Sequence, residues 1–263
     1  MDKGGYRLYY MEHGRLCPPG VIGIIASSFS ADGYCWQREA GIRIGPVLPC
    51  GANRVLAPDI IFLPEGRLRM YFEARTSGMV ESILSAVSEN GLDWEIEPGV
   101  RLRDEMGRTG FGTPCCVLRP GGHGWRLYFH ARSETKYEIW SAISSDGLTW
   151  EIEHGTRIAQ TKPEETYAAY SPYVVPVECG WRMYYSGWQR DPVLRGYILA
   201  AISPDGLTWT KEPGRALEPG SALDAVHCSE PCLLRLADGR WRLFYEAQGT
   251  DGRWRILGAT AVT

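Results

Sequence analysis

The sequence contains no long apolar run and no excess of either charge. No stretch approaches the roughly 18 consecutive apolar residues of a membrane-spanning helix. Residues 1–5 are polar and do not show the charged-then-apolar pattern of a secretory signal. The 28 Lys and Arg residues against 31 Asp and Glu residues give a formal net charge of −3, without the basic excess of a nucleic-acid-binding protein. We therefore expect a cytoplasmic protein with neither a nucleic-acid partner nor a membrane partner.

Metal-binding motifs are also missing from the chain. The eight cysteines include no Cys-x-x-Cys pair, and no two histidines have the His-x-x-x-His spacing of a zinc site. No dedicated acidic loop of the calcium-binding kind is present either. Because we expect no oxidising compartment, we interpret the cysteines as reduced residues, mostly buried in the core. The sequence therefore predicts neither a metal nor another cofactor.

Helical spacing of apolar residues is absent from every ten-residue stretch, whereas turn-forming and aromatic residues are abundant. The chain has 31 Gly, 10 Trp and 14 Tyr residues. Aromatic residues are enriched in strands, and glycine is enriched in the turns between them. This composition predicts an all-β protein.

One repeated unit accounts for nearly the whole chain. The phrase Ser-x-Asp/Asn-Gly-x-x-Trp occurs four times, and its tryptophans stand 58, 56 and 59 residues apart. A second phrase, Arg-Leu/Met-Tyr/Phe-Tyr/Phe, occurs five times in step with it, beginning at Arg7, Arg69, Arg126, Arg182 and Arg242. We expect five repeats, at about residues 6–50, 57–105, 113–160, 170–220 and 229–263.

Each repeat divides into short strands separated by turns. In the second repeat we expect four strands, A to D, at residues 59–63, 67–75, 82–88 and 94–97, with Asn90-Gly91 as the turn between C and D. A meander with two apolar faces needs neighbours on both sides, and radial stacking of such sheets provides them. We therefore predict a five-bladed β-propeller, formed as a single domain over residues 1–263. A β-sandwich is the alternative, although a sandwich does not require the internal period.

The two ends of the chain depart from the repeat. The first repeat starts at its strand B, because residues 1–5 are too short for a strand A, and the last repeat stops after strand C. We therefore expect irregular first and last blades and an irregular ring closure.

Candidate functional residues fall where the start of strand A and the end of strand B meet, at one end of each blade. These positions differ between repeats while the scaffold phrases stay similar. Carboxylates and imidazoles in a partly dry funnel would have shifted pKa values, as acid–base catalysis requires. The strand A candidates are Asp59, Tyr170, Tyr173, His227 and Glu230, and the strand B candidates are Glu12, Glu73, Arg75, His130, Arg132, Trp188 and Glu246.

Several candidates also have a structural interpretation. Asp59 could cap a turn after Pro58, and Glu73 with Arg75 could form an ion pair between blades, as could Glu246. His130 could be a buried histidine with satisfied hydrogen bonds. Trp188 could be a core residue or a platform on which a sugar ring stacks.

The phrases Arg182-Met-Tyr-Tyr-Ser-Gly187 and Ser203-Pro-Asp-Gly-Leu-Thr-Trp209, with a strand A that begins at a proline, resemble those of a known group. They are similar to the five-bladed propellers of the arabinanase, levansucrase and invertase superfamily, which includes family 43 and family 32 glycoside hydrolases and mannoside phosphorylases. The resemblance covers nearly all of the chain.

The resemblance implies roles for two residues. Asp59, in Ala-Pro-Asp, matches the residue that tunes the pKa of the general acid in family 43 and orients it. Glu230 approximates the general acid, although it directly precedes Pro231, where the family usually has one residue between. The family's general base, an Asp on the first strand A, has no counterpart here.

The leading hypothesis is an enzyme that acts on a glycoside or a sugar-derived small molecule by carboxylate acid–base catalysis, with Glu230 as acid and Asp59 as its modulator. Glu73, Glu246 or Glu12 would then activate water. Three alternatives stay open. A cyclisation, elimination or isomerisation would use His130, His227 and Glu73, a phosphorylase would hold phosphate with Arg75 and Arg132, and a non-catalytic sugar-binding propeller would use Trp188 and Tyr173.

Overall fold

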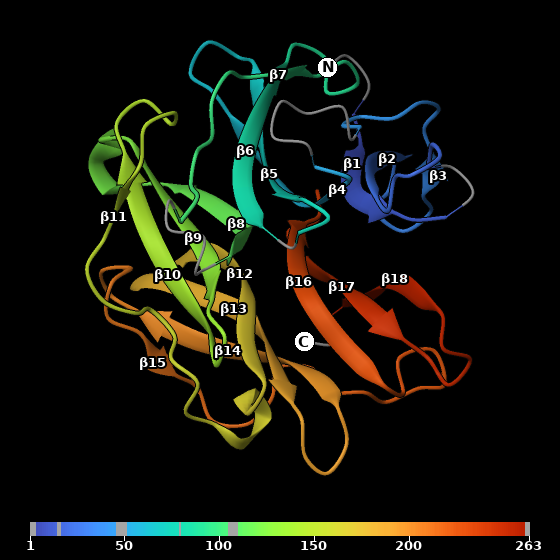
Figure 1. The fold of residues 1–263 in the computed structure, drawn as a ribbon, viewed down its shortest axis with the longest axis vertical. Coiled ribbons are helices and arrows are strands. Elements are labelled where there is room, and N and C mark those ends of the chain that lie inside the picture. The colour runs from blue at the N-terminus through green and yellow to red at the C-terminus, as the bar shows by residue number, and fades with distance from the viewer. Residues whose placement is uncertain (1–3, 15–16, 46–51, 79, 105–109, 261–263) are drawn as a thin grey trace. The chain divides into compact units, whose positions relative to one another are not determined.

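The computed structural model describes residues 4–14, 17–45, 52–78, 80–104 and 110–260 (Figure 1). The chain forms two compact units. The N-terminal unit comprises residues 1–127 and 143–151, and the C-terminal unit comprises residues 128–142 and 152–263. The described helical segments are two short 3-10 turns, Pro120–Gly122 and Pro163–Glu165. No helix in the described ranges is long and apolar enough to span a membrane.

The N-terminal unit contains two consecutive antiparallel sheets. The first has three strands, β1 (Tyr6–Glu12), β2 (Ile24–Ser30) and β3 (Gln37–Arg38). The second has four, β4 (Arg54–Phe62), β5 (Leu68–Arg75), β6 (Glu81–Ser88) and β7 (Glu95–Ile96). A further four-stranded sheet follows in the same order, with β8 (Gly110–Leu118), β9 (Trp125–Arg132), β10 (Tyr137–Ser144) and β11 (Glu151–Ile152).

The C-terminal unit continues with a meander of β12 (Ala168–Val177), β13 (Gly180–Gln189), β14 (Arg195–Ser203) and β15 (Thr210–Lys211). Strands β16 (His227–Arg235), β17 (Trp241–Gln248) and β18 (Trp254–Thr260) follow. A parallel bridge between Gly196 and His227 joins both groups into one seven-stranded sheet. The predicted all-β fold of antiparallel meanders is confirmed, and the ring of five blades stays a prediction.

The core of the N-terminal unit explains why its meanders are apolar on both faces. Val55, Met70 and Phe72 are fully buried in one cluster, and Leu84 and Ala86 of β6 pack with them. Strand β5 is buried at every position except Arg75. Among the seven described cysteines, all free thiols, Cys115, Cys116 and Cys228 are buried.

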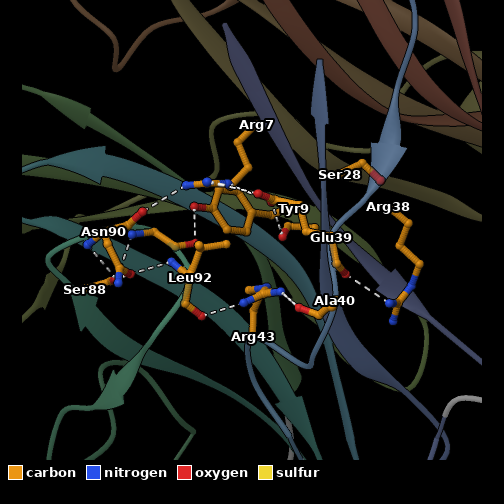
Figure 2. Close-up of polar contacts among 12 residues, drawn as sticks. Arg7, Tyr9, Ser28, Arg38, Glu39, Ala40, Arg43, Ser88, Asn90 and Leu92 are labelled. Carbon is orange, nitrogen blue, oxygen red and sulfur yellow. Dashed lines mark hydrogen bonds and ion pairs between the residues drawn. The ribbon is translucent and has the colours of Figure 1, made fainter. Parts of the chain in front are cut away.

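The Ser-x-Asp/Asn-Gly-x-x-Trp phrase forms a turn held by its own side chains (Figure 2). The Ser88 hydroxyl accepts the Gly91 N–H at 2.9 Å, and Asn90 Oδ1 accepts the Leu92 N–H at 2.8 Å. Gly91 has a φ of +73°, in the left-handed region that favours glycine. The Trp94 indole closes the turn by donating to the Gly91 carbonyl at 3.2 Å.

The preceding sheet binds this turn through its second repeated phrase. The Tyr9 hydroxyl donates to the Gly91 carbonyl at 2.8 Å, and Arg7 donates to the Asn90 carbonyl at 3.0 Å (Figure 2). The Tyr9 ring meets Trp94 edge-on, with centroids 5.7 Å apart. Both phrases therefore form a joint between successive sheets. Equivalent hydroxyl contacts occur between Tyr71 and Gly147 and, in the C-terminal unit, between Tyr128 and Gly206.

Candidate active site

The same backbone irregularity recurs in four strands. Among the described residues, four non-glycine residues have a positive φ of 46° to 52°, and each directly precedes a proline. Such a left-handed residue costs about 1 to 3 kcal/mol, and residues of this kind concentrate at functional sites. They are Ala57 in β4, Thr113 in β8, Ser171 in β12 and Glu230 in β16.

Ala57, Ser171 and Glu230 lie at bulges in β4, β12 and β16. The pairing register shifts between Leu56 and Asp59 in β4, and between Ser229 and Cys232 in β16. The bulge explains why β4 begins at Arg54 rather than at Asp59, where the sequence placed its start, since the chain stays paired on both sides of the irregularity. In β16 the strained residue is Glu230 itself. In β4 it is Ala57, two residues before Asp59.

Two of the strained N–H groups are bound by a side chain from the preceding repeat. In the N-terminal unit, Thr113 donates its N–H to Glu73 Oε2 at 3.2 Å. In the C-terminal unit, Glu230 donates its N–H to the Ser186 hydroxyl oxygen at 2.7 Å. Glu73 and Ser186 occupy the same place in their repeats, two residues after Tyr71 and Tyr184. The end of strand B thus fixes the next bulge.

A polar cluster surrounds Tyr170 in the C-terminal unit. The side chains of Ser229 and Ser186 lie beside the Tyr170 hydroxyl, which also lies in the field of Glu230 and Glu246. Burial and then these two carboxylates raise the pKa of Tyr170, so the phenol stays protonated. The Ser229 hydroxyl donates to Glu246 Oε2 at 3.2 Å. Two carboxylates and one phenolic donor are therefore gathered in one place.

A stack of parallel rings lies in the same unit. His227 is sandwiched between Trp188 and Trp254, at centroid distances of 4.5 and 5.4 Å and interplanar angles of 8° and 2°. The Gly196 N–H donates to His227 Nδ1 at 3.0 Å, which leaves the hydrogen of the neutral ring on Nε2. Burial, followed by the charge of Arg195, lowers the pKa of His227. A neutral imidazole flanked by indoles results.

Further aromatic contacts connect this stack to other predicted site residues. The Tyr170 ring lies 6.0 Å from Trp188 and 6.2 Å from His130, measured between centroids. Arg132 lies over the Tyr137 ring, at 5.8 Å from its centroid. The C-terminal unit therefore brings together most of its sequence-predicted candidates, namely His130, Tyr170, Trp188, His227, Glu230 and Glu246.

Tyr173 and Glu12 take part in other contacts. The Tyr173 hydroxyl donates to the Leu233 carbonyl at 2.9 Å and so ties β12 to β16. Glu12, in the N-terminal unit, forms an ion pair of 2.9 Å with Arg38 on β3. The structure gives each of these side chains a scaffold contact.

Asp59, in the N-terminal unit, has a carboxyl pKa that is raised into the range useful for proton transfer. Burial raises the pKa of Asp59 from 3.8 to about 7, and hydrogen bonds from the Cys116 and Ile60 backbone oppose the rise. The Cys116 N–H donates to Asp59 Oδ2 at 2.7 Å and fixes the orientation of the carboxyl. A carboxyl with a pKa near neutrality can both give and take a proton.

Glu73 and Arg75 belong to a buried ion-pair network. The Arg75 guanidinium lies 2.6 Å from Glu73 Oε1 and 3.0 Å from Glu81 Oε1, and both carboxylates are fully buried. Glu73 therefore uses one oxygen for Arg75 and the other for Thr113. Gly110 leaves room for this network, because a Cβ there would lie 2.0 Å from Glu81 Oε2.

Sequence reasoning missed Ser229 as a member of the polar cluster, and it missed Glu81 and Trp254. All four left-handed residues belong to an X-Pro pair, at residues 57–58, 113–114, 171–172 and 230–231. No group of three or more His, Cys, Asp or Glu side chains within the described ranges could hold a metal ion.

Comparisons with known proteins agree with this architecture. No family model matches the chain. An uncharacterized protein of Mycobacterium tuberculosis, Rv1502, is 28% identical over 219 residues, which cover 78% of this chain and 67% of the relative.

Solved structures give a closer match in three dimensions. A glycosyl hydrolase from Bacteroides ovatus has a TM-score of 0.78 at 14% identity, covering 100% of this chain and 84% of its own. A thermostable family-43 glycoside hydrolase has a TM-score of 0.77 at 15% identity, and the match covers 100% of this chain and 87% of the hydrolase. An exo-1,5-α-L-arabinanase from a bovine ruminal metagenomic library has a TM-score of 0.71 at 14% identity, and the match covers 99% of this chain and 90% of the arabinanase. The chain therefore has the β-propeller fold of these glycoside hydrolases, and the resemblance found in its repeats is confirmed at the level of the fold.

Proposed function

We propose that the protein is a glycoside-active enzyme built on a five-bladed propeller, with Glu230 as its general acid. The observation that carries the proposal is the strained backbone of Glu230, whose N–H is bound by Ser186 beside Tyr170 and a second carboxylate, Glu246. Strain of this kind persists only where the surroundings impose it. At Glu230 the strained position carries a carboxyl, which the surroundings hold in one direction near a second carboxylate.

Glu246 is the best candidate to activate water among the three considered from the sequence. The Ser229 hydroxyl orients it, and it shares the field around Tyr170 with Glu230. Glu73 has both oxygens engaged by Arg75 and Thr113, and Glu12 is paired with Arg38. An acid and a base of this kind are the two groups that glycoside hydrolysis requires.

The remaining side chains of the C-terminal unit suit the binding of a sugar. The protonated Tyr170 hydroxyl can donate a hydrogen bond, and indole rings such as Trp188 and Trp254 present apolar faces to the C–H groups of a pyranose or furanose. The structural neighbours, which include an arabinanase and glycoside hydrolases, support a carbohydrate substrate.

Asp59 is proposed separately as a group that controls proton transfer. Asp59 matches the Ala-Pro-Asp motif of family 43, and its pKa of about 7 supports a role in proton exchange. The Asp59→Asn variant tests this role by itself.

The proposal is tested by product formation from a panel of aryl glycosides and oligosaccharides, with and without inorganic phosphate. Wild type is compared with Glu230→Gln and with Glu178→Gln, an exposed control in the same unit. We expect turnover by wild type and the control, without a phosphate requirement, and its loss in Glu230→Gln. Turnover that requires phosphate would indicate a phosphorylase, and an undiminished Glu230→Gln would contradict the assignment of the acid.

A further inference from the structure

We infer that Ser186 is a positioning residue for Glu230, holding it in the left-handed conformation that sets the direction of its carboxylate. The inference rests on the proposed function, because it concerns how that function's general acid is oriented. Ser186 is fully buried at the end of β13, and its hydroxyl oxygen lies 2.7 Å from the Glu230 nitrogen.

The local backbone geometry makes this hydrogen bond important for the conformation of Glu230. Glu230 has a φ of 52°, and the next residue, Pro231, has a fixed φ and no N–H of its own. The Glu230 N–H lies inside the bulge, where the regular ladder between β16 and β17 is interrupted between Ser229 and Cys232. Ser186 therefore supplies the acceptor that the ladder does not.

The N-terminal unit contains an equivalent contact. Glu73, at the place equivalent to Ser186, accepts the N–H of Thr113, which has a φ of 46° and precedes Pro114. The bulge residue is thus fixed by the preceding repeat in both units, whatever side chain the bulge residue carries.

A neutral serine at position 186 is compatible with the negative charge of the Glu230 side chain. The equivalent places in the other repeats hold Met11, Glu73, His130 and Glu246, whereas the one that binds Glu230 holds a small neutral hydroxyl. A carboxylate at position 186 would satisfy the N–H but would place a second negative charge beside the Glu230 side chain. A serine accepts the N–H without adding that charge.

Ser186 also connects the bulge to the polar cluster. Its oxygen accepts the Glu230 N–H, and its side chain lies beside the Tyr170 hydroxyl. A hydroxyl that accepts one hydrogen bond still has its own hydrogen to donate and a second lone pair. Removing it would take the acceptor from Glu230 and a polar neighbour from Tyr170.

The test compares Ser186→Ala with Ser186→Thr, which keeps the hydroxyl. The control is Ser203→Ala, which removes another buried hydroxyl of the same unit, one that accepts the Gly206 N–H in a turn. Misplacement of a catalytic group by about 1 Å can cost up to about 100-fold in rate. We expect Ser186→Ala to lower kcat about 10- to 100-fold with KM within about twofold, Ser186→Thr to recover most of kcat, and Ser203→Ala to keep kcat.

Crystal structures of the same variants provide a readout that does not depend on turnover. We expect φ at residue 230 to leave the left-handed region in Ser186→Ala and to remain there in Ser186→Thr and Ser203→Ala. An unchanged φ and kcat in Ser186→Ala would overturn the inference, as would an equal loss of kcat in Ser203→Ala. If Glu230→Gln retained full activity, the proposed function would fail, and the φ values would still decide whether Ser186 fixes residue 230.

Discussion

At the scale of single residues, Asp59 makes the stability of the protein depend on pH. Burial raises its pKa from 3.8 to about 7, so the folded protein binds a proton at Asp59 that the unfolded chain releases between these values. The contribution of Asp59 is therefore most favourable below about pH 4 and is lost as the pH rises toward 7. This direction is opposite to that of a carboxylate whose pKa is lowered by an ion pair.

We predict that Asp59→Asn is more stable than wild type at pH 8, and that the difference shrinks or reverses toward pH 4. An asparagine is neutral throughout and can still accept the Cys116 N–H. Urea denaturation midpoints between pH 4 and 8 measure the effect. The control is Asp238→Asn, since Arg240 lowers the pKa of Asp238 and its titration lies below this range. Parallel curves for wild type and Asp59→Asn would show that Asp59 is not buried as described.

At the scale of elements, the contact between β6 and β8 depends on the absence of one side chain. A Cβ at Gly110 would lie 2.0 Å from Glu81 Oε2, and Glu81 is fully buried in the ion pair with Arg75. Breaking a buried ion pair costs about 3 to 5 kcal/mol.

We predict that Gly110→Ala destabilises the protein by about 3 kcal/mol or more, because the carboxylate must leave its partner or β8 must shift. Gly45→Ala is the matched control, since a Cβ there would have its nearest neighbour at 3.9 Å. Chemical denaturation of both variants and wild type measures their free energies of unfolding. Equal stability of Gly110→Ala and wild type would contradict the tight approach of the two strands.

The strands could be predicted from the sequence to a good extent, but the bulges could not. Turn residues such as Asn90-Gly91 and the alternation around Tyr71 indicate the meander through local preferences alone. A residue before proline ordinarily favours an extended conformation, so Ala57, Thr113 and Glu230 read as plain strand. Their left-handed conformation depends on tertiary contacts, such as those of Glu73 with Thr113 and Ser186 with Glu230, that join segments tens of residues apart.

At the scale of the whole molecule, the repeat predicted which candidate residues would lie close together, and the role of each stays a prediction. The rule that strand A starts meet strand B ends selects Tyr170, Glu230 and Glu246, and the C-terminal unit brings these together. The same rule selects Tyr173, which binds a backbone carbonyl. Side-chain direction alternates along a strand and changes at a bulge, so one position of error converts a site residue into a scaffold residue.

The central claim is that the Glu230 carboxyl donates a proton to the leaving group of a glycoside. The most direct measurement compares Glu230→Gln with wild type on two glycosides of the same sugar, one with a dinitrophenyl leaving group and one with an alkyl leaving group. A general acid contributes about 10²- to 10⁴-fold where the leaving group needs protonation, and little where it does not. We predict that the variant loses at least about 100-fold in kcat on the alkyl glycoside but far less on the dinitrophenyl glycoside. Equal losses on both substrates, or no loss on the alkyl glycoside, would contradict the assignment.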